Sequence, residues 1–151
     1  MAIEWLLKKF DELTPRELYA ALRLRNEVFV VEQHCVFQDA DDQDPCCFHL
    51  LGYAEGRLVA YTRLVPPGAI YEEPSIGRVV TAPSVRRSGA GKELMQQSIA
   101  AVYRLFGPLP IRIGAQLYLR KFYQDFGFEQ ISDAYLEDGI EHIYMLKKTD
   151  T

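Results

Sequence analysis

The sequence has few cysteines, and their arrangement excludes two common uses of this residue. The 151-residue chain contains three of them, Cys35, Cys46 and Cys47. An odd number with two adjacent members does not suit a disulfide framework, and the C-x-x-C spacing of many zinc sites is missing. We therefore expect reduced thiols, no bound metal and a cytoplasmic location.

Long apolar runs and an excess of positive charge are also missing. No run of 18 apolar residues occurs, and the first ten residues carry Glu4, Lys8 and Lys9, so we expect neither a membrane span nor a signal peptide. The formal net charge of -4 argues against a general nucleic-acid binder, because phosphate backbones need a basic surface. It does not exclude an anionic small ligand, which needs only a local cluster of positive charge.

What the sequence does have is the composition of an ordinary globular domain. Apolar residues make up 48% and charged residues 25% of the chain, which is long enough to bury one hydrophobic core. It contains no linker, internal repeat or low-complexity segment. We expect a single domain over residues 1–151.

Periodicity and turn residues predict an α/β domain with a mixed sheet. Thr14 and Glu17 form a capping box with Pro15 at the first helical position, and two hairpins are indicated at residues 55–57 and at Asp138-Gly139. An acidic loop follows the first helix, over residues 33–44. Strands are predicted at residues 3–8, 48–54, 58–65, 75–81, 111–115, 128–136 and 140–147, and later helices at 89–106 and before Gly127.

The most informative segment joins a predicted strand to the long helix, and it reads Arg86-Arg87-Ser88-Gly89-Ala90-Gly91-Lys92. Glycines let a ligand approach the backbone closely, and a helix N-terminus offers free N–H groups and a positive dipole end. Such a loop suits a phosphate or pyrophosphate. A dinucleotide fingerprint needs glycine where Leu94 stands, and a Walker loop needs glycine at position 86 and Ser or Thr at position 93, so neither fits.

The remaining pattern, R-x-x-G-x-G after a strand, resembles the coenzyme A loop of the GNAT superfamily of N-acetyltransferases. The segment from Phe122 to Phe128 is similar to the second signature of that family, Y-x-x-x-G-F. Further blocks resemble the ElaA-like branch of GNAT proteins, at residues 29–33, 76–79, 114–116 and 137–143. The resemblance implies a GNAT fold, with a mixed, mostly antiparallel sheet flanked by helices.

The resemblance also implies the reaction: a primary amine attacks the thioester of acetyl-CoA directly, without a covalent enzyme intermediate. A strand end would offer its backbone to the pantetheine arm, and the glycine loop would hold the pyrophosphate. Gln116 stands where the family often has a cofactor-contacting asparagine. The implied coenzyme A contacts are Val79, Val80, Thr81, Arg86, Arg87, Ser88, Gly89, Ala90, Gly91, Lys92 and Gln116.

The catalytic residues are less well marked. Tyr123 matches the family's tyrosine acid, which serves the departing thiolate, although it also fits the apolar side of its helix. No carboxylate occurs at residues 75–81, where many GNAT enzymes have their base. Glu32 is the first substitute, with a surface carboxylate as its alternative reading. His142 could be a base, an acceptor contact or a structural histidine, and His49 has the same readings with less support.

The acceptor side stays open in the sequence. Arg78 could bind an acceptor carboxylate, or it could pair with Glu32 or Asp41. The acidic loop at residues 39–44 could attract a cationic amine or simply be solvated. We expect a small-molecule or peptide amine as the acceptor, with no nucleic-acid or membrane partner, and leave open whether the chain forms a homodimer. The alternative function is an inactive acyl-CoA-binding regulatory module, which the missing carboxylate favours.

Overall fold

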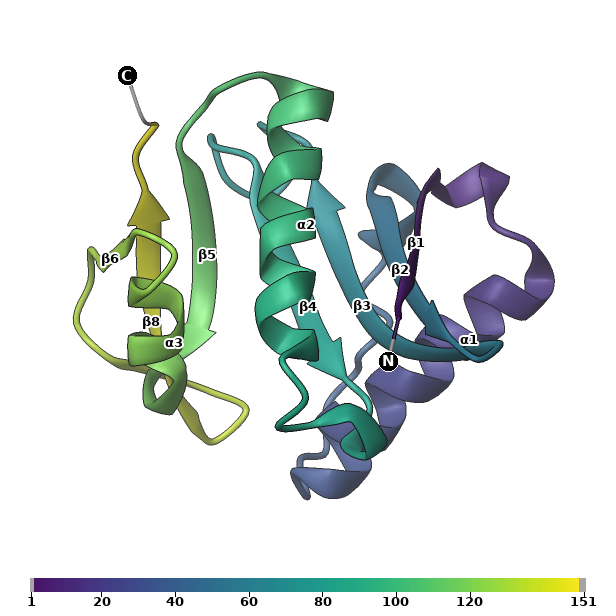
Figure 1. Ribbon diagram of the computed structural model, residues 1–151. Coiled ribbons are helices and arrows are strands. Elements are labelled where there is room, and N and C mark those ends of the chain that lie inside the picture. The colour runs from purple at the N-terminus through teal and green to yellow at the C-terminus, as the bar shows by residue number, and fades with distance from the viewer. Residues whose placement is uncertain (1, 150–151) are drawn as a thin grey trace.

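The predicted strands form one mixed sheet in the computed structural model, which describes residues 2–149; Met1, Asp150 and Thr151 of the expected domain lie outside this range. The order along the sheet is β1-β2-β3-β4-β5-β8-β6, and β7 also pairs with β8 (Figure 1). All these pairs are antiparallel except β4 with β5. The strands are β1 (Glu4–Lys9), β2 (Phe48–Ala54), β3 (Arg57–Val65), β4 (Ser75–Thr81), β5 (Ile111–Gln116), β6 (Phe128–Gln130), β7 (Tyr135–Glu137) and β8 (Ile140–Lys147).

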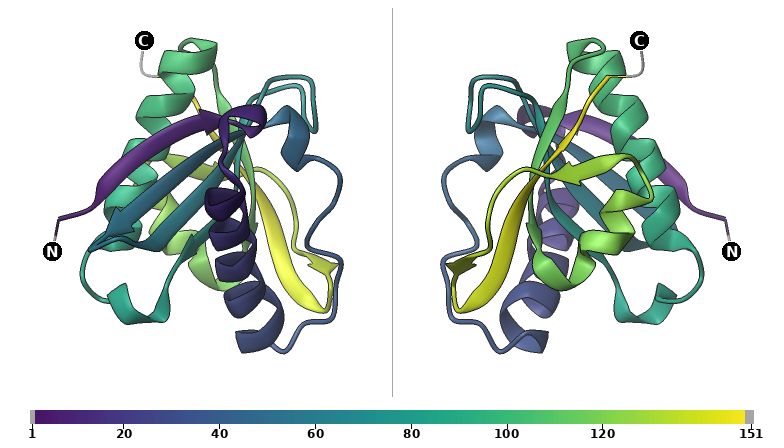
Figure 2. Two further views of the ribbon diagram at one scale, coloured as in Figure 1. Left: turned by 90° about the vertical axis from the view of Figure 1, so that its right-hand side faces the viewer. Right: turned by 90° about the vertical axis from the view of Figure 1, so that its left-hand side faces the viewer.

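Helices cover both faces of this sheet. α1 (Pro15–Arg25) lies behind it, and α2 (Ala90–Phe106) and α3 (Arg120–Gln124) lie in front (Figures 1 and 2). The predicted capping box is confirmed, because the Thr14 side chain accepts a hydrogen bond from the Glu17 amide and the Glu17 carboxylate accepts one from the Thr14 amide. A π-helical segment, Asn26–Glu32, continues α1. Single 3-10 turns occur at Phe10–Glu12, Asp44–Cys46, Pro83–Val85 and Leu117–Leu119. Among the described residues, no helix is both long enough and apolar enough to cross a bilayer.

The single strand predicted over residues 128–136 is wrong, because β6 and β7 are separate pieces. Between them the chain bends away from β8, although the Ile131 amide still donates to the Tyr144 carbonyl. The Ser132 hydroxyl takes the next position in the ladder and accepts a hydrogen bond from the Tyr144 amide at 2.9 Å. A side-chain oxygen therefore replaces a backbone carbonyl at this point and interrupts the strand.

The main core lies between α2 and the centre of the sheet. Leu94, Met95 and Val102 of α2 have no exposed surface. Met95 and Val102 pack in one cluster with Ile113 of β5 and Ile143 of β8, and Leu94 packs with Leu50 and Ala60. Full burial of one such side chain contributes roughly 1.5–3 kcal/mol, so this layer fixes the position of α2 over β4 and β5.

The two parallel strands at the centre separate soon after they meet. Their register pairs Ser75 with Arg112 and no later residue. Within β4, Arg78 has a φ of 50° and the register with β3 shifts, which marks a β-bulge. Past the bulge, Val80 and Thr81 pair with β3 but not with β5. One backbone edge of β4 is therefore free at the centre of the sheet.

Candidate active site

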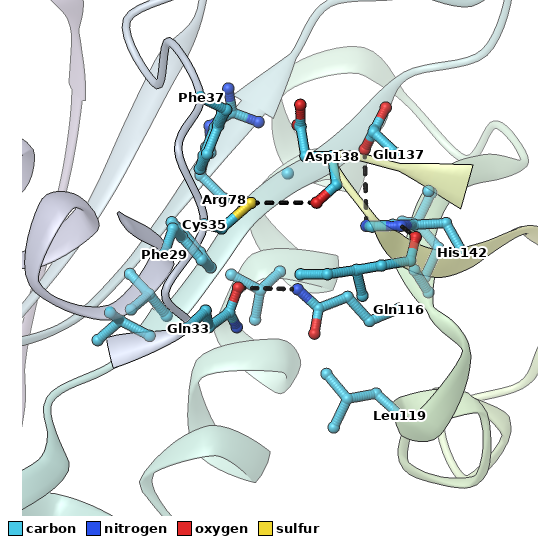
Figure 3. A pocket seen from close by; sticks show the side chains of 18 of the residues that line it. Phe29, Gln33, Cys35, Phe37, Arg78, Gln116, Leu119, Glu137, Asp138 and His142 are labelled. Atoms are coloured by element: carbon cyan, nitrogen blue, oxygen red, sulfur yellow. Dashed lines mark hydrogen bonds and ion pairs between the residues drawn. The ribbon is translucent and has the colours of Figure 1, made fainter. Parts of the chain in front are cut away.

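A pocket of about 810 Å³ opens where β4 and β5 separate (Figure 3). Its walls come from β4, β5, α3 with the turn before it, the π-helical segment with the loop after it, and the turn between β7 and β8. The pocket brings together predicted site residues from distant parts of the sequence. Those that line it are Glu32, Val79, Val80, Thr81, Arg86, Gln116, Tyr123 and His142.

The rest of the predicted glycine loop is not part of the pocket lining: residues 87–89 lead into α2, and residues 90–92 form its first turn. Gly89 caps this helix with a φ of 87°, a conformation that glycine adopts without strain. A Cβ atom added to Gly91 would lie 3.8 Å from the Phe122 ring, an ordinary contact. Since the fold itself does not require glycine at position 91, the free space there is available to a ligand. With the free edge of β4, the loop fits the elongated, anionic shape of coenzyme A.

Tyr123 lies in the pocket wall with only 5% of its surface exposed. Its ring packs against Phe122 and Phe128, as the apolar reading of this position expected. Within residues 2–149, however, its hydroxyl makes no hydrogen bond. Burial raises the pKa of Tyr123 well above its usual value, so the phenol stays protonated at neutral pH. The hydroxyl is therefore a hydrogen-bond donor available to a ligand.

Glu32 is engaged in a bidentate ion pair at the mouth of the pocket. Its carboxylate accepts hydrogen bonds from Nη1 and Nη2 of Arg86 at 2.6 and 2.5 Å. These bonds and the Arg86 charge lower the pKa of Glu32, which makes it a weaker base. The pairing argues against Glu32 as the general base, and it also occupies an arginine expected to bind the cofactor.

His142 has a geometry better suited to accepting a proton. The residue lies on β8 opposite Gln116, and 8% of its surface is exposed. Its Nδ1–H donates to the Ile140 carbonyl at 2.8 Å, so the other ring nitrogen of the neutral form carries a lone pair. That atom, Nε2, is 3.5 Å from Oε2 of Glu137. No local pattern in the sequence indicates that Glu137 belongs to the site.

The segment that follows the π-helix closes one side of the pocket. Gln116 Nε2 donates to Gln33 Oε1, and the Cys35 thiol donates to the Asp138 carbonyl, both at 3.3 Å (Figure 3). These contacts join residues 33–35 to β5 and to the β7–β8 turn. The amide of Gln116, an expected cofactor contact, is thus held by the protein. Cys35 and Asp138 are 103 residues apart, and no local pattern in the sequence indicates their contact.

Arg78 extends from the bulge of β4 into a polar cluster beside the pocket. Its Nε donates to Oδ1 of Asp39 at 2.9 Å, and its Nη2 donates to the Asp39 carbonyl and lies 3.4 Å from Asp41. Of the two predicted ion-pair partners the structure shows Asp41, and Glu32 is paired elsewhere. The Phe37 ring lies 5.8 Å from the guanidinium carbon.

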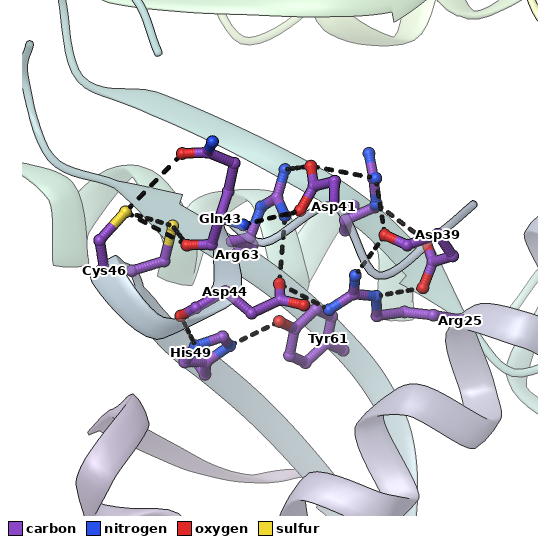
Figure 4. Close-up of polar contacts among 11 residues, drawn as sticks. Arg25, Asp39, Asp41, Gln43, Asp44, Cys46, His49, Tyr61 and Arg63 are labelled. Atoms are coloured by element: carbon purple, nitrogen blue, oxygen red, sulfur yellow. Dashed lines mark hydrogen bonds and ion pairs between the residues drawn. The ribbon is translucent and has the colours of Figure 1, made fainter. Parts of the chain in front are cut away.

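The acidic loop forms ion pairs with arginines from three elements, α1, β3 and β4 (Figure 4). Arg25 of α1, only 1% exposed, binds Asp39 and Asp44, and Arg63 of β3 binds Asp44 and Asp41. Although burial would raise them, the hydrogen bonds and charges of these arginines lower the pKa of Asp44 and bring that of Asp41 to about 2. The predicted readings, a solvated run and an attraction for a cationic amine, therefore do not fit Asp39, Asp41 and Asp44, which arginines bind, whereas Asp42 is exposed.

His49 and Cys47 belong to the same buried region, outside the pocket lining, and the adjacent Cys46 is exposed. The Nε2–H of His49 donates to the Asp44 carbonyl and its Nδ1 accepts the Tyr61 hydroxyl proton at 2.6 Å. Burial lowers the pKa of His49, so the ring is neutral and structural rather than a base. The Cys46 and Cys47 sulfurs lie 4.0 Å apart, a weak hydrogen-bond contact, and do not form a disulfide.

Comparison with known proteins places this geometry in a family. Residues 20–149 match the model of the acetyltransferase (GNAT) domain. A UPF0039 protein of Synechocystis is 42% identical over 147 residues, covering 97% of this chain and 96% of its own, and the protein ElaA of Escherichia coli is 39% identical over 148 residues, covering 97% of both.

Solved structures agree with this assignment. A crystal structure of an acyl-CoA N-acyltransferase from Pseudomonas aeruginosa is similar with a TM-score of 0.93 and 40% identity, over 97% of this chain and 99% of that one. The crystal structure of Escherichia coli ElaA has a TM-score of 0.91 and 38% identity, over 97% and 100%. The separated central strands, the glycine loop that begins α2 and these likenesses over nearly the whole length agree: the chain belongs to the GNAT family of acyltransferases.

Proposed function

We propose that this protein transfers an acetyl group from acetyl-CoA to a primary amine, by direct attack of the amine on the thioester. The observation that carries the proposal is the free backbone edge of Val79–Thr81, which leads from the pocket to the glycine loop at the start of α2. Tyr123 and His142 line the same pocket from two other elements. A site that holds both reactants replaces a bimolecular encounter by a positioned one.

The cofactor contacts follow from the backbone. The unpaired edge of β4 would bind the pantetheine amides, as a neighbouring strand does. Main-chain N–H groups from Arg87 to Lys92 would bind the pyrophosphate, and Arg86 would add positive charge. These residues fit the cofactor because the loop offers donors and space, and Gly91 has no other role in the fold.

The proton steps are assigned to two side chains. The incoming ammonium would give one proton to Nε2 of His142, which leaves the amine lone pair free to form the new bond to the acetyl carbon. As the bond from carbon to sulfur breaks, the nitrogen would lose its second proton to the departing thiolate, and the Tyr123 hydroxyl would donate a hydrogen bond to that sulfur. Because the pKa of Tyr123 is raised, stabilisation by this hydrogen bond is favoured over full proton transfer.

The direct test is release of free thiol from acetyl-CoA in the presence of a panel of primary amines. Amine-dependent thiol release, with the acetylated amine seen by mass spectrometry, is the expected result. Tight binding of acetyl-CoA in calorimetry without thiol release from any amine would instead support the regulatory module. Absence of binding would refute both functions.

A further inference from the structure

The end of the pocket away from the glycine loop carries an excess of negative charge. Beside it, three arginines and three aspartates of the buried cluster cancel one another, and at the mouth Glu32 cancels Arg86. Glu137 and Asp138 remain, and in the part of the chain that the structure describes neither is paired with a lysine or arginine. Both line the pocket, next to His142 (Figure 3).

Two of these groups can accept hydrogen bonds from one ligand. Nε2 of His142, which carries a lone pair when the ring is neutral, and Oε2 of Glu137 lie 3.5 Å apart, and the Glu137 side chain is 60% exposed whereas His142 is 8% exposed. Nδ1 of the same ring already donates to the Ile140 carbonyl and cannot turn towards Glu137. An ammonium group has three N–H donors and a positive charge, so it can satisfy both acceptors together.

Arg78, which lines this end of the pocket, already binds carboxylates of the protein. Nε and Nη2 of Arg78 are bound to Asp39, and Nη2 also lies near Asp41, so its charge is already neutralised. An acceptor with a carboxylate would bring a third negative charge beside Glu137 and Asp138, which is unfavourable at short range. The local charge therefore selects cations and rejects amino acids.

The closure of the pocket limits the size of the acceptor. The hydrogen bonds from Gln116 to Gln33 and from Cys35 to Asp138 hold residues 33–35 across one side of the pocket. Phe29 and Phe37 line the same wall and offer apolar surface to a short alkyl chain. These features suit a flexible small molecule better than a residue of a folded protein.

Building on the proposed function, we infer that the amine acceptor is a small diamine or polyamine. One of its ammonium groups lies at Nε2 of His142 and reacts, and another positive group lies against the carboxylates of Glu137 and Asp138. The second charge would meet two carboxylates that are not paired with a lysine or arginine among the described residues.

The test uses three amines of one chain length that differ only at the far end: 1,4-diaminobutane, n-butylamine and 4-aminobutyrate. Each is titrated by calorimetry into the full-length protein saturated with coenzyme A. We expect the diamine to bind about tenfold more tightly than butylamine, and 4-aminobutyrate to bind more weakly than both. Equal affinities, or tighter binding of 4-aminobutyrate through Arg78, would overturn the inference.

Asp138→Asn is the informative variant, because asparagine tolerates the φ of 51° at this turn and keeps the carbonyl that Cys35 contacts. It is expected to weaken diamine binding about fivefold and leave butylamine unchanged. Glu141→Gln, an exposed carboxylate on β8 outside the pocket lining, is the control and is expected to change neither. An unchanged diamine affinity in Asp138→Asn would refute the subsite.

A different observation would refute the proposed function, namely that the protein does not bind coenzyme A. In that case the three amines are titrated into the free protein, and the same order of affinities still decides the inference.

Discussion

At the scale of single residues, His142 has the arrangement that a general base needs. One ring nitrogen is fixed by the Ile140 carbonyl, and the other faces the pocket. His142→Gln is expected to lower kcat/KM for the amine about 100-fold, the usual range for loss of a general base, with acetyl-CoA affinity within about twofold of wild type. Steady-state kinetics and calorimetry check the two effects.

The control for this variant is His34→Asn, which changes an exposed histidine outside the pocket lining. It should leave both quantities unchanged. If His142→Gln retained full turnover, the ring would be structural, and the proton would have to leave by another route.

The ion pair of Glu32 with Arg86 makes a second prediction at this scale. Because the carboxylate occupies the two guanidinium nitrogens that a phosphate would use, Glu32→Gln should free Arg86. We expect the dissociation constant of acetyl-CoA to fall about threefold at low salt, a gain in the range of an exposed ion pair that screening removes at high salt.

Calorimetry at two salt concentrations measures this change, with Glu72→Gln, another exposed glutamate, as the control. Weaker binding in Glu32→Gln would mean that Glu32 orients Arg86 for the cofactor rather than competing with it.

At the scale of elements, the loop over residues 38–47 is held by buried charges. Asp44 accepts from both Arg25 and Arg63, so Asp44→Asn leaves two buried guanidinium groups short of a counter-charge. We expect a loss of about 3–5 kcal/mol in the free energy of unfolding. Asp42→Asn, an exposed change in the same loop, should stay within about 0.5 kcal/mol of wild type. Urea unfolding measures both.

The ion pairs of the same loop predict that the free energy of unfolding decreases as the pH falls below about 4. In the folded protein the pKa of Asp41 is about 2 and that of Asp44 is also lowered, so the unfolded chain takes up these protons first as pH falls. Their stabilisation is complete above the unfolded pKa of about 3.9 and is lost as pH falls towards 2. Asp44→Asn should therefore show a shallower loss of stability between about pH 4 and 2.

Strands whose ends are marked by turn residues or prolines could be predicted from the sequence. The limits predicted for β2, β4 and β8 are those observed, because each strand ends at a turn or a proline-rich break. The gap between β6 and β7 could not be read, because it depends on Ser132 meeting Tyr144, a partner twelve residues away. Local patterns carry no information about such contacts.

The site was predictable to a similar depth. Its glycine loop, β4 edge and Tyr123 follow from motifs, and the pocket brings most of them together. Most ion-pair partners did not follow: Arg86 binds Glu32, and the loop aspartates bind Arg25 and Arg63, although Asp41 was one of the two partners expected for Arg78. Glu137 and Asp138 looked only like turn residues, because their closeness to His142 and Cys35 arises from strand pairing and a contact across the pocket.

At the scale of the whole molecule, the sheet consists of two parts with a weak join. Strands β1–β4 and β5–β8 share one register pair, Ser75 with Arg112, and α2 packs over the gap between them. The pocket lies in that gap, with β4 on one side and β5 on the other. A ligand along the free edge of β4 would therefore contact both parts of the sheet. It would add contacts between two parts that share only one register pair among the described residues.

Hydrogen exchange can detect this bridging. At 100 times its dissociation constant, acetyl-CoA stabilises the fold as a whole by about 2.7 kcal/mol. Exchange at the amides of residues 79–81 and 114–117 should slow together, because one ligand would cover both strands. Gly91→Asp places a side chain and a negative charge in the space left for the pyrophosphate, so it should abolish the protection on both strands while the thermal midpoint without ligand changes little. Protection limited to the first turn of α2 would mean that the ligand binds the loop without entering the gap, and acyl transfer in the pocket would then have no structural basis.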